Sequence, residues 1–289
     1  MTGPVAAILP GQRLHLQHGP IDLVIGADGD RDAAFAAATD RFQTVLEELV
    51  QELPLLRRPV GDAPAGLVAQ RMHAACIPQA EGVTFVTPMA AVAGSVADEV
   101  LAAMVAAAPL TRAYVNNGGD IALYLGPGAR FEIGLAGLDG IGLGRACVDA
   151  DMAVRGVATS GAGGRSLSLG IADSVTVLAA NAAAADVAAT LIAGAVDLAD
   201  HPEIRRVPAS DVQDDSDLGD RPVVRAVGLL TPDEVARALA AGVAAARQMR
   251  QRGLIVGAAL MLRGQARVVG DIAPRAVHDK QEEGILAHA

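Results

Sequence analysis

The spacing of apolar residues predicts four long helices. Between Asp32 and Leu53 apolar residues recur at helical spacing, and Pro54 is expected to end that helix. Pro88–Ala108, an Ala-rich stretch, is expected to be a helix or a tight turn entering one, and Asn181–Leu198 is expected to be a helix. The clearest prediction is Thr231–Arg252, which starts on a threonine cap, a proline and a glutamate in capping-box positions.

Short apolar runs separated by turn residues predict the strands. They lie between the helices in groups, with a solvated acidic loop expected at residues 201–221. The predicted strand segments are Arg13–Ile25 (two strands around a turn), Gly82–Val86, Ala113–Leu125 (interrupted by a turn), Phe131–Ala136, Val148–Ala158, Leu167–Ala179, Val223–Leu229, Leu254–Leu262 and Ala266–Val269. This order favours an α+β fold, with helices on one face of a largely antiparallel sheet. We expect a single domain over residues 1–270 and a loose tail over residues 271–289.

Composition excludes some classes of function. The 289 residues are 52% hydrophobic but only 2% aromatic, and the net charge is -10. A chain this acidic lacks the positive charge and the stacking side chains that nucleic-acid binding uses. Two cysteines make no disulfide framework, the start does not resemble a secretion signal, and no unbroken apolar run has spanning length. These features predict a cytoplasmic protein without a membrane partner.

Two glycine-rich turns carry the main candidate site. One lies in Tyr114–Asp120 (Y-V-N-N-G-G-D) and the other in Ala158–Asp173, which begins A-T-S-G-A-G-G-R. Glycine lets backbone N–H groups approach a ligand closely, and each turn has a charged neighbour, Asp120 or Arg165. We expect both turns to line one pocket for a nucleotide-like molecule. Two ordinary β-turns are the alternative interpretation.

The second turn is expected to bind the phosphate end of that ligand. Gly161, Gly163 and Gly164 permit positive φ angles, which align N–H donors. The guanidinium of Arg165 suits phosphate oxygens, and the hydroxyls of Ser166 and Ser168 add donors on one strand face. Alternatively, Arg165 pairs with an aspartate and holds the two turns together.

Asp186 and Thr190 are candidate metal ligands. They stand four residues apart on a predicted helix, so their oxygens face one side amid Ala, Val and Ile. A buried carboxylate needs a partner, and such ligands suit Mg²⁺. The alternative is a hydrogen bond from Asp186 to Thr190 or to the sheet. Gly94, unfavourable in a helix, indicates a backbone contact with ligand or metal near Ala93.

Cys76 with nearby His73 suggests a nucleophile. The apolar setting A-A-C-I-P favours instead a buried, inert thiol.

These motifs together resemble the ApbE superfamily of flavin transferases, and more closely its UPF0280-type branch. N-N-G-G-D at Asn116–Asp120 resembles the superfamily's G-G-D turn, and A-T-S-G at Ala158–Gly161 its T-S-G turn. A-D-V-A-A-T at Ala185–Thr190 resembles its magnesium helix, and Pro88–Asp98 the loop-helix that supplies a backbone ligand and flavin contacts. The resemblance covers about Leu14 to Gly270.

The resemblance implies a T-fold-like α+β architecture with an internal duplication, an FAD-shaped cleft and a magnesium site. Carried onto this chain, the flavin-nucleotide contacts are Met89, Asn117, Gly118, Gly119, Asp120, Thr159, Ser160, Gly161, Arg165 and Ser166, and the metal ligands are Ala93, Asp186 and Thr190.

Two departures bear on catalysis. The transferases carry a histidine followed by Asp-Pro after T-S-G, but this chain has no histidine between Val148 and Asp200. They also carry a lysine before the glycine of the loop-helix, where this chain has Ala93. Loss of a general base costs roughly 10²–10⁴-fold in rate. We therefore expect the cleft to persist without a recognisable transferase centre.

Four functions remain open at this point. The first is flavin or nucleotide binding, and the second is FMN transfer with Asp173 or His73 as a different base. The third is an accessory enzyme acting on a small anionic metabolite, for example in sulfur or amino-acid metabolism. The fourth is a ligand-free scaffold. Exposed Ala-rich helices are further expected to make the protein a homo-oligomer.

Overall fold

The computed structural model describes residues 3–81, 85–136, 142–164, 166–270 and 285–287. Its centre is a nine-stranded sheet in which every neighbouring pair is antiparallel. In spatial order the strands are β1 (Val5–Leu9), β2 (Arg13–His18), β3 (Ile21–Gly29), β4 (Leu110–Asn117), β5 (Asp120–Leu125), β8 (Gly156–Ser160), β9 (Ser174–Ala179), β12 (Gly257–Leu262) and β13 (Gln265–Val269).

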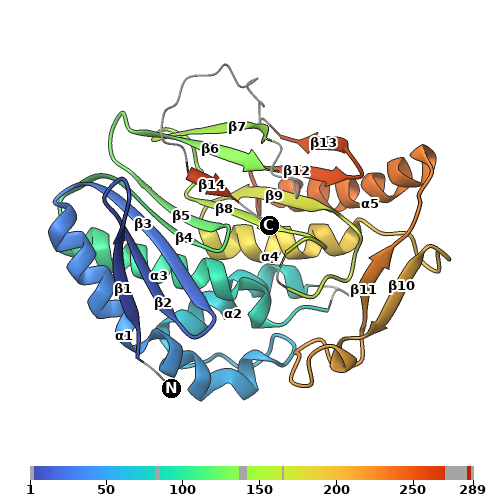
Figure 1. The fold of residues 1–289 in the computed structure, drawn as a ribbon, viewed down its shortest axis with the longest axis horizontal. Helices are drawn as coiled ribbons and strands as arrows, with labels where there is room; N and C mark the ends of the chain where they lie inside the picture. Colours follow the sequence, from blue (N-terminus) through green and yellow to red (C-terminus); the bar gives the residue numbers. More distant parts are fainter. Residues whose placement is uncertain (1–2, 82–84, 137–141, 165, 271–284, 288–289) are drawn as a thin grey trace.

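Helices cover one face of this sheet, as the sequence predicts (Figure 1). The described residues contain five α-helices: α1 (Arg31–Leu56), α2 (Leu67–Ala80), α3 (Val92–Ala107), α4 (Ala182–Ala195) and α5 (Pro232–Gln251). Helix α3 packs on β4 and β5, α4 on β8 and β9, and α5 on β12 and β13, while α2 packs on the other helices. The α+β class with antiparallel sheets is therefore confirmed.

A small sheet lies over the other face (Figure 1). It contains β6 (Arg130–Ala136), β7 (Gly142–Asp149) and β14 (Ile285–Ala287), and β14 runs parallel to β6. Phe131 and Ile133 of β6 pack with Ile121 and Leu123 of β5 in a separate apolar cluster. β14 lies within the segment predicted to be a loose tail, most of which falls outside the described residues.

One helical stretch, Pro88–Ala107, is long and apolar enough to cross a membrane by length and composition alone. Half of its most apolar window is buried, and it packs against α1, α2, α4 and the sheet. A core helix has the same length and composition, and its neighbours here identify it as one. The stretch opens with the 3₁₀ helix η1 (Pro88–Ala91), which matches the predicted turn into a helix.

Three predicted strands are wrong in extent. Val148–Ala158 contains the end of β7 and the start of β8, because the guanidinium of Arg155 donates to three carbonyls of the intervening turn. Leu167–Ala179 is a strand only from Ser174, since residues before it pack against the end of α4, where Ile171 N–H donates to the Val196 carbonyl. Gly82–Val86 falls partly outside the described residues, and Phe85 and Val86 are not in a strand.

The acidic segment at residues 201–221 is not simply a solvated loop. It contains β10 (Ile204–Pro208), which pairs with β11 (Pro222–Val227), and a turn of 3₁₀ helix, Ala209–Asp211. Its carboxylates contact the helical layer: Asp215 pairs with Arg57 at 2.5 Å, and Asp217 accepts from the Thr87 hydroxyl. Local sequence did not show these partners because they lie more than one hundred residues away.

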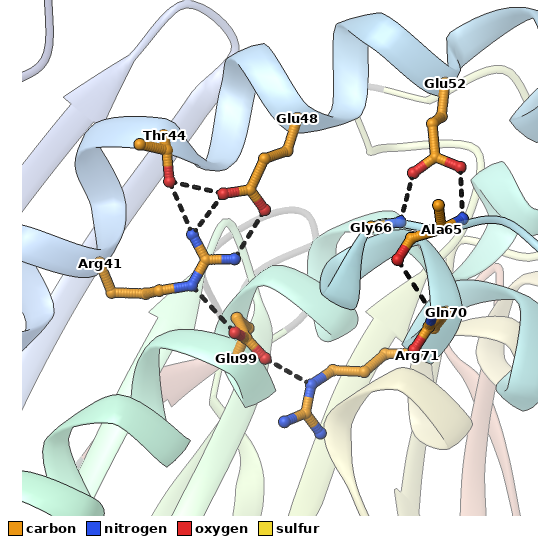
Figure 2. Close-up of polar contacts among 9 residues, drawn as sticks. All are labelled: Arg41, Thr44, Glu48, Glu52, Ala65, Gly66, Gln70, Arg71 and Glu99. Atoms are coloured by element: carbon orange, nitrogen blue, oxygen red, sulfur yellow. Dashed lines mark hydrogen bonds and ion pairs between the residues drawn. The ribbon is translucent and has the colours of Figure 1, made fainter.

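A charge cluster joins α1, α2 and α3 (Figure 2). The Glu99 carboxylate on α3 accepts from Arg41 Nε of α1 at 2.9 Å and from Arg71 Nε of α2 at 2.8 Å. Arg41 also donates to both carboxylate oxygens of Glu48. Burial alone would raise the pKa of Glu99, but the hydrogen bonds from the two arginines outweigh it, so the pKa lies below its ordinary value.

Glu99→Gln is expected to lower the free energy of unfolding at pH 7 by about 2 kcal/mol, because two arginines lose a buried anionic acceptor. Because the pKa of Glu99 is lower in the folded than in the unfolded protein, its charged form contributes fully to stability above the unfolded pKa of about 4.3. The contribution is lost as the pH falls through the folded-state pKa. Denaturation from pH 7 to pH 3 should therefore show the gap between wild type and variant closing in acid. A gap that stays constant would contradict the charged role of Glu99. Glu48→Gln is the matched control and should cost less, since Glu48 is more exposed.

Candidate functional site

The candidate site is built around the start of α3, where α3 and α4 make their closest approach. A Cβ atom on Gly94 would lie 2.3 Å from the Ala182 carbonyl oxygen and 2.8 Å from the Ala183 nitrogen. Glycine is required here because the backbones of the two helices touch. The sequence predicted a backbone contact with ligand or metal at this position, whereas the contact that requires glycine in the structure is with the backbone of α4.

Each of the two helices supplies an aspartate to the other's first turn. Asp186 Oδ2 on α4 accepts from Gly94 N–H at 3.0 Å. Asp98 on α3 accepts from Ala182 N–H at 3.0 Å and Ala183 N–H at 2.9 Å. Carboxylates at helix N-termini satisfy free N–H groups and interact favourably with the helix dipole. The hydrogen bond of Asp186 is thus to the start of α3, and not to Thr190 or the sheet as the alternative proposed.

Both aspartates have carboxyl pKa values above the ordinary one. Burial raises the pKa of Asp186 to about 7, against the lowering effect of the backbone N–H donors, and the charge of Asp98 raises it further. Burial likewise raises the pKa of Asp98 to about 6. Two partly buried carboxylates repel each other when both are ionised, so the electrostatics of this position favour a proton or a cation.

The G-G-D turn also contacts the start of α3. Asn117 Nδ2 at the end of β4 donates to the Ala93 carbonyl at 3.1 Å, and Asn117 is buried. Gly118 and Gly119 between β4 and β5 have φ angles of 65° and 113°, which only glycine adopts freely. The turn, the Ala93 carbonyl and Asp186 are therefore linked through Ala93 and Gly94. Thr190 lies one helical turn beyond Asp186 and is partly exposed.

The T-S-G turn lies beside the G-G-D turn. β5 and β8 pair antiparallel with Ile121 opposite Val157, so the start of β5 and the end of β8 lie at the same end of the sheet. Thr159 Oγ1 hydrogen-bonds to Thr176 Oγ1 at 2.9 Å. A Cβ on Gly161 would lie 2.5 Å from the Asp173 carbonyl oxygen, and its φ is not positive. The expected positive φ is therefore wrong at Gly161, which is needed for close packing.

The remaining predicted contacts are placed as follows. Met89 lies in η1, half-buried, and η1 contacts α4. Ser160 is half-buried at the end of β8, and Ser166 is exposed in the loop after it. Arg165 lies outside the described residues, so its predicted roles remain predictions. Hydrogen bonds join three of the four motif stretches, and the pairing of β5 with β8 places the T-S-G turn at the same end of the sheet as the G-G-D turn.

Cys76 is fully buried. Burial raises the pKa of its thiol to about 12, with a further contribution from the charge of Asp186. The thiol faces the Thr87 carbonyl at 3.5 Å. The predicted burial of this thiol is therefore confirmed, and a raised pKa disfavours the thiolate that a nucleophile needs.

The two candidates for a replacement base differ in position. His73 is nearly buried, and its Nε2 contacts the Gly61 carbonyl at 2.9 Å. Asp173 packs against Gly161 of the T-S-G turn, and its carboxylate accepts from Arg263 N–H at 2.5 Å. Of the two, Asp173 adjoins the candidate site through a described contact.

The position of Asp98 beside the candidate site was not predicted from the sequence. This aspartate is the last residue of the motif P-M-A-A-V-A-G-S-V-A-D, four positions after Gly94, but that motif gave it no role. Its partners are backbone N–H groups more than eighty residues away, which sequence spacing does not show.

The side chains near the start of α3 limit the kind of metal site that could form there. Among residues that the structure describes, no three His, Cys, Asp or Glu side chains gather. A site at the start of α3 would therefore use mixed oxygen ligands, namely one carboxylate, a hydroxyl and a backbone carbonyl. Such a donor set fits a hard cation such as Mg²⁺.

Comparison with known proteins gives three findings. A family model described as AbpE bacteria matches residues 6–268. A UPF0280 protein of Methanosphaerula palustris is 41% identical over 131 residues, which is 45% of this chain and 52% of that protein, so the chain spans about half the length of this curated relative. Two solved structures align at 12% identity over 92% of this chain. They are the flavin transferase ApbE from Vibrio cholerae (TM-score 0.46, 96% of that chain) and the apo form of the Pseudomonas stutzeri flavinyl transferase ApbE (TM-score 0.42, 93% of that chain).

Proposed function

The chain belongs to the AbpE bacteria family, which confirms the ApbE resemblance of its motifs, and from this we propose that it binds a flavin nucleotide together with Mg²⁺. The observation that carries the proposal is the meeting of three motif stretches at the start of α3. Asn117 bonds to the Ala93 carbonyl and Asp186 to the Gly94 N–H. Capping explains the hydrogen bonds of Asp98 and Asp186 without a ligand, but the raised pKa of each carboxyl favours a cation beside them.

In this proposal Asp186, Thr190 and the Ala93 carbonyl hold the cation. Bound there, Mg²⁺ would neutralise pyrophosphate charge. The chain's own residues orient the ligand: the glycines of the G-G-D turn admit it close to the backbone, and Asp120, Thr159 and Ser160 supply polar groups at the adjacent strand ends. Met89 contributes an apolar contact from η1.

FMN transfer is not part of the proposed function. The T-S-G turn is followed by no histidine up to Asp200, and Ala93 stands where the transferases have lysine. Incubating the protein with FAD, Mg²⁺ and a target peptide should leave the peptide mass unchanged. A peptide carrying FMN would contradict this. Asp173, beside Gly161, would then be the first base to replace with asparagine.

The binding experiment is calorimetric titration with FAD and with riboflavin in the presence of Mg²⁺. FAD should bind more tightly, because only FAD carries the pyrophosphate. Arg165→Ala should stay folded and lose about 1.5–3 kcal/mol of FAD affinity, the range for a hydrogen bond to a charged group. Arg225→Ala, at an exposed position on β11, is the control and should bind as the wild type does. An Arg165 variant that melts early, yet binds FAD normally once folded, would assign Arg165 a structural role.

We further propose a T-fold-like arrangement with an internal duplication, in a cytoplasmic homo-oligomer. Two halves of the central sheet support the duplication, since β2, β3, β4 and β5 carry α1 and α3 while β8, β9, β12 and β13 carry α4 and α5. Superposing the halves tests it. The Ala-rich α3 and α4 are packed inside, so the oligomer rests instead on exposed apolar residues such as Ile8 and Leu67. Light scattering should give at least twice the monomer mass of 29.2 kDa, and a clean monomer would contradict the oligomer.

A further inference from the structure

The sheet face away from the helices carries a polar cleft. On β4, Ala113 and Val115 are buried toward the helices, so Arg112 and Tyr114 alternate onto the opposite face. A cavity of about 270 Å³ lies there between this face and β6. Its polar lining includes Gln12, Arg13, Asp28, Arg31, Arg112 and Glu132.

The floor of the cleft is fixed by aromatic packing. A Cβ on Gly26 would lie 2.4 Å from Cε1 of Tyr114, so the tyrosine ring rests directly on the glycine backbone. The ring meets Phe131 edge to face, with centroids 6.0 Å apart. The guanidinium of Arg112 lies 5.3 Å from the centroid of the Phe131 ring. This cation–π contact restricts the orientation of the Arg112 guanidinium plane.

The arginines of the cleft are anchored through some of their nitrogens while others have no partner among the described residues. Arg112 donates through Nε to Asp28 at 2.6 Å and through Nη1 to the Arg130 carbonyl at 3.0 Å, which leaves Nη2. Arg13 donates only through Nε, to the Pro10 carbonyl at 3.0 Å, which leaves both terminal nitrogens. The cleft therefore presents unpaired guanidinium donors on fixed arginines.

The charges in the cleft do not cancel. Three arginines line it against two carboxylates, and Glu132 is paired with Arg145 at 2.9 Å. Asp28 alone is shared between Arg112 and Arg31, the latter at 3.6 Å. A local positive excess in a chain of net charge -10 favours an anion at this place.

We propose that this cleft binds a small metabolite through a phosphate or carboxylate group. The oxyanion accepts hydrogen bonds from the terminal nitrogens of Arg13 and from Nη2 of Arg112, in the paired geometry that guanidinium offers to such groups. Asp28 competes with the ligand for Arg112. The site is independent of the flavin proposal, because Asn117 lies on the helix side of the same strand.

The test is calorimetric titration of the full-length protein with inorganic phosphate and, separately, with succinate, at low ionic strength, where charge interactions are least screened. At least one anion should bind saturably. Arg13→Gln should weaken that binding about tenfold, because charge-assisted hydrogen bonds are lost. Asp28→Asn should strengthen it, because the internal competitor loses its charge. Which anion binds more tightly identifies the phosphate or the carboxylate as the recognised group.

Arg267→Gln is the matched control, since Arg267 is also exposed near the edge of the same sheet and donates only to neighbouring residues. It should leave anion binding unchanged, as should Arg165→Ala, which separates this cleft from the phosphate end of the flavin site. The proposal is overturned if neither anion binds saturably, if Arg13→Gln and Arg267→Gln weaken binding equally, or if Asp28→Asn weakens it.

Discussion

Gly94→Ala is expected to lower the free energy of unfolding by at least about 3 kcal/mol, the upper end of the cost of overpacking a core. The added methyl group would lie 2.3 Å from the Ala182 carbonyl oxygen and 2.5 Å from its carbon. Both atoms belong to the backbone of α4, so rotation of a side chain cannot relieve the clash. The two helices would have to separate, which would also break the bonds of Asp186 and Asp98 at their starts. Chemical denaturation measures the loss.

A second helical glycine provides the control. Gly194 lies near the end of α4, and a Cβ there would meet only Cβ of Leu169, at the ordinary distance of 3.7 Å. Gly194→Ala should therefore be neutral or stabilise the protein by up to about 1 kcal/mol, because alanine is the better helix former. Equal effects of the two substitutions would show that Gly94 matters only through helix propensity, and would contradict the close approach of α3 and α4.

Elements defined by local signals were predicted well from the sequence. The capping box that begins α5 forms as expected, with Thr231 and Glu234 each bonding to the other's backbone. The hairpin of β2 and β3 is also confirmed. Predicted helix ends were less accurate: the first helix continues past Pro54 to Leu56, since proline in a last turn removes one hydrogen bond without preventing the turn.

Elements defined by distant partners were predicted poorly. β1 was not expected, because a short apolar run near Pro4 and Pro10 has no strand pattern of its own and is held by pairing with β2. The residues before Ser174 look like a strand in sequence but bond to the end of α4. In both cases the deciding hydrogen bonds lie outside the local sequence window.

The same division applies to the candidate site. Helix propensity identified Gly94, the N-N-G-G-D turn and its family resemblance identified Asn117, and the spacing to Thr190 identified Asp186. These three residues are joined by hydrogen bonds through Ala93 and Gly94. The reciprocal role of Asp98 could not be predicted, because it depends on how α3 and α4 pack. Spacing also could not show that Asp186 bonds to backbone N–H of α3, which gives this carboxylate a structural role beside any metal.

Asp186→Asn is expected to abolish stabilisation of the protein by Mg²⁺ without unfolding it. Asparagine keeps an oxygen that accepts from Gly94 N–H, so the start of α3 remains capped. It also removes one of two partly buried carboxylates that repel each other, so the metal-free variant should be at least as stable as the wild type at pH 8. The wild type, with Mg²⁺ at about 100 times its dissociation constant, should gain about 2.7 kcal/mol.

Thermal denaturation with Mg²⁺ and with a chelator measures both effects, and three further variants identify the ligands. Asp32→Asn makes the same chemical change at an exposed position in the first turn of α1 and should keep the full response to Mg²⁺. Thr190→Val removes the proposed ligand hydroxyl and should weaken the response, whereas Thr190→Ser keeps the hydroxyl and should preserve it. If Asp186→Asn still responds as the wild type does, Asp186 serves only to cap α3. If Asp32→Asn loses the response equally, the ion interacts with the overall negative charge. Loss confined to Asp186→Asn and Thr190→Val would place the cation on the face of α4 that carries both side chains, because residues four apart lie one above the other on a helix.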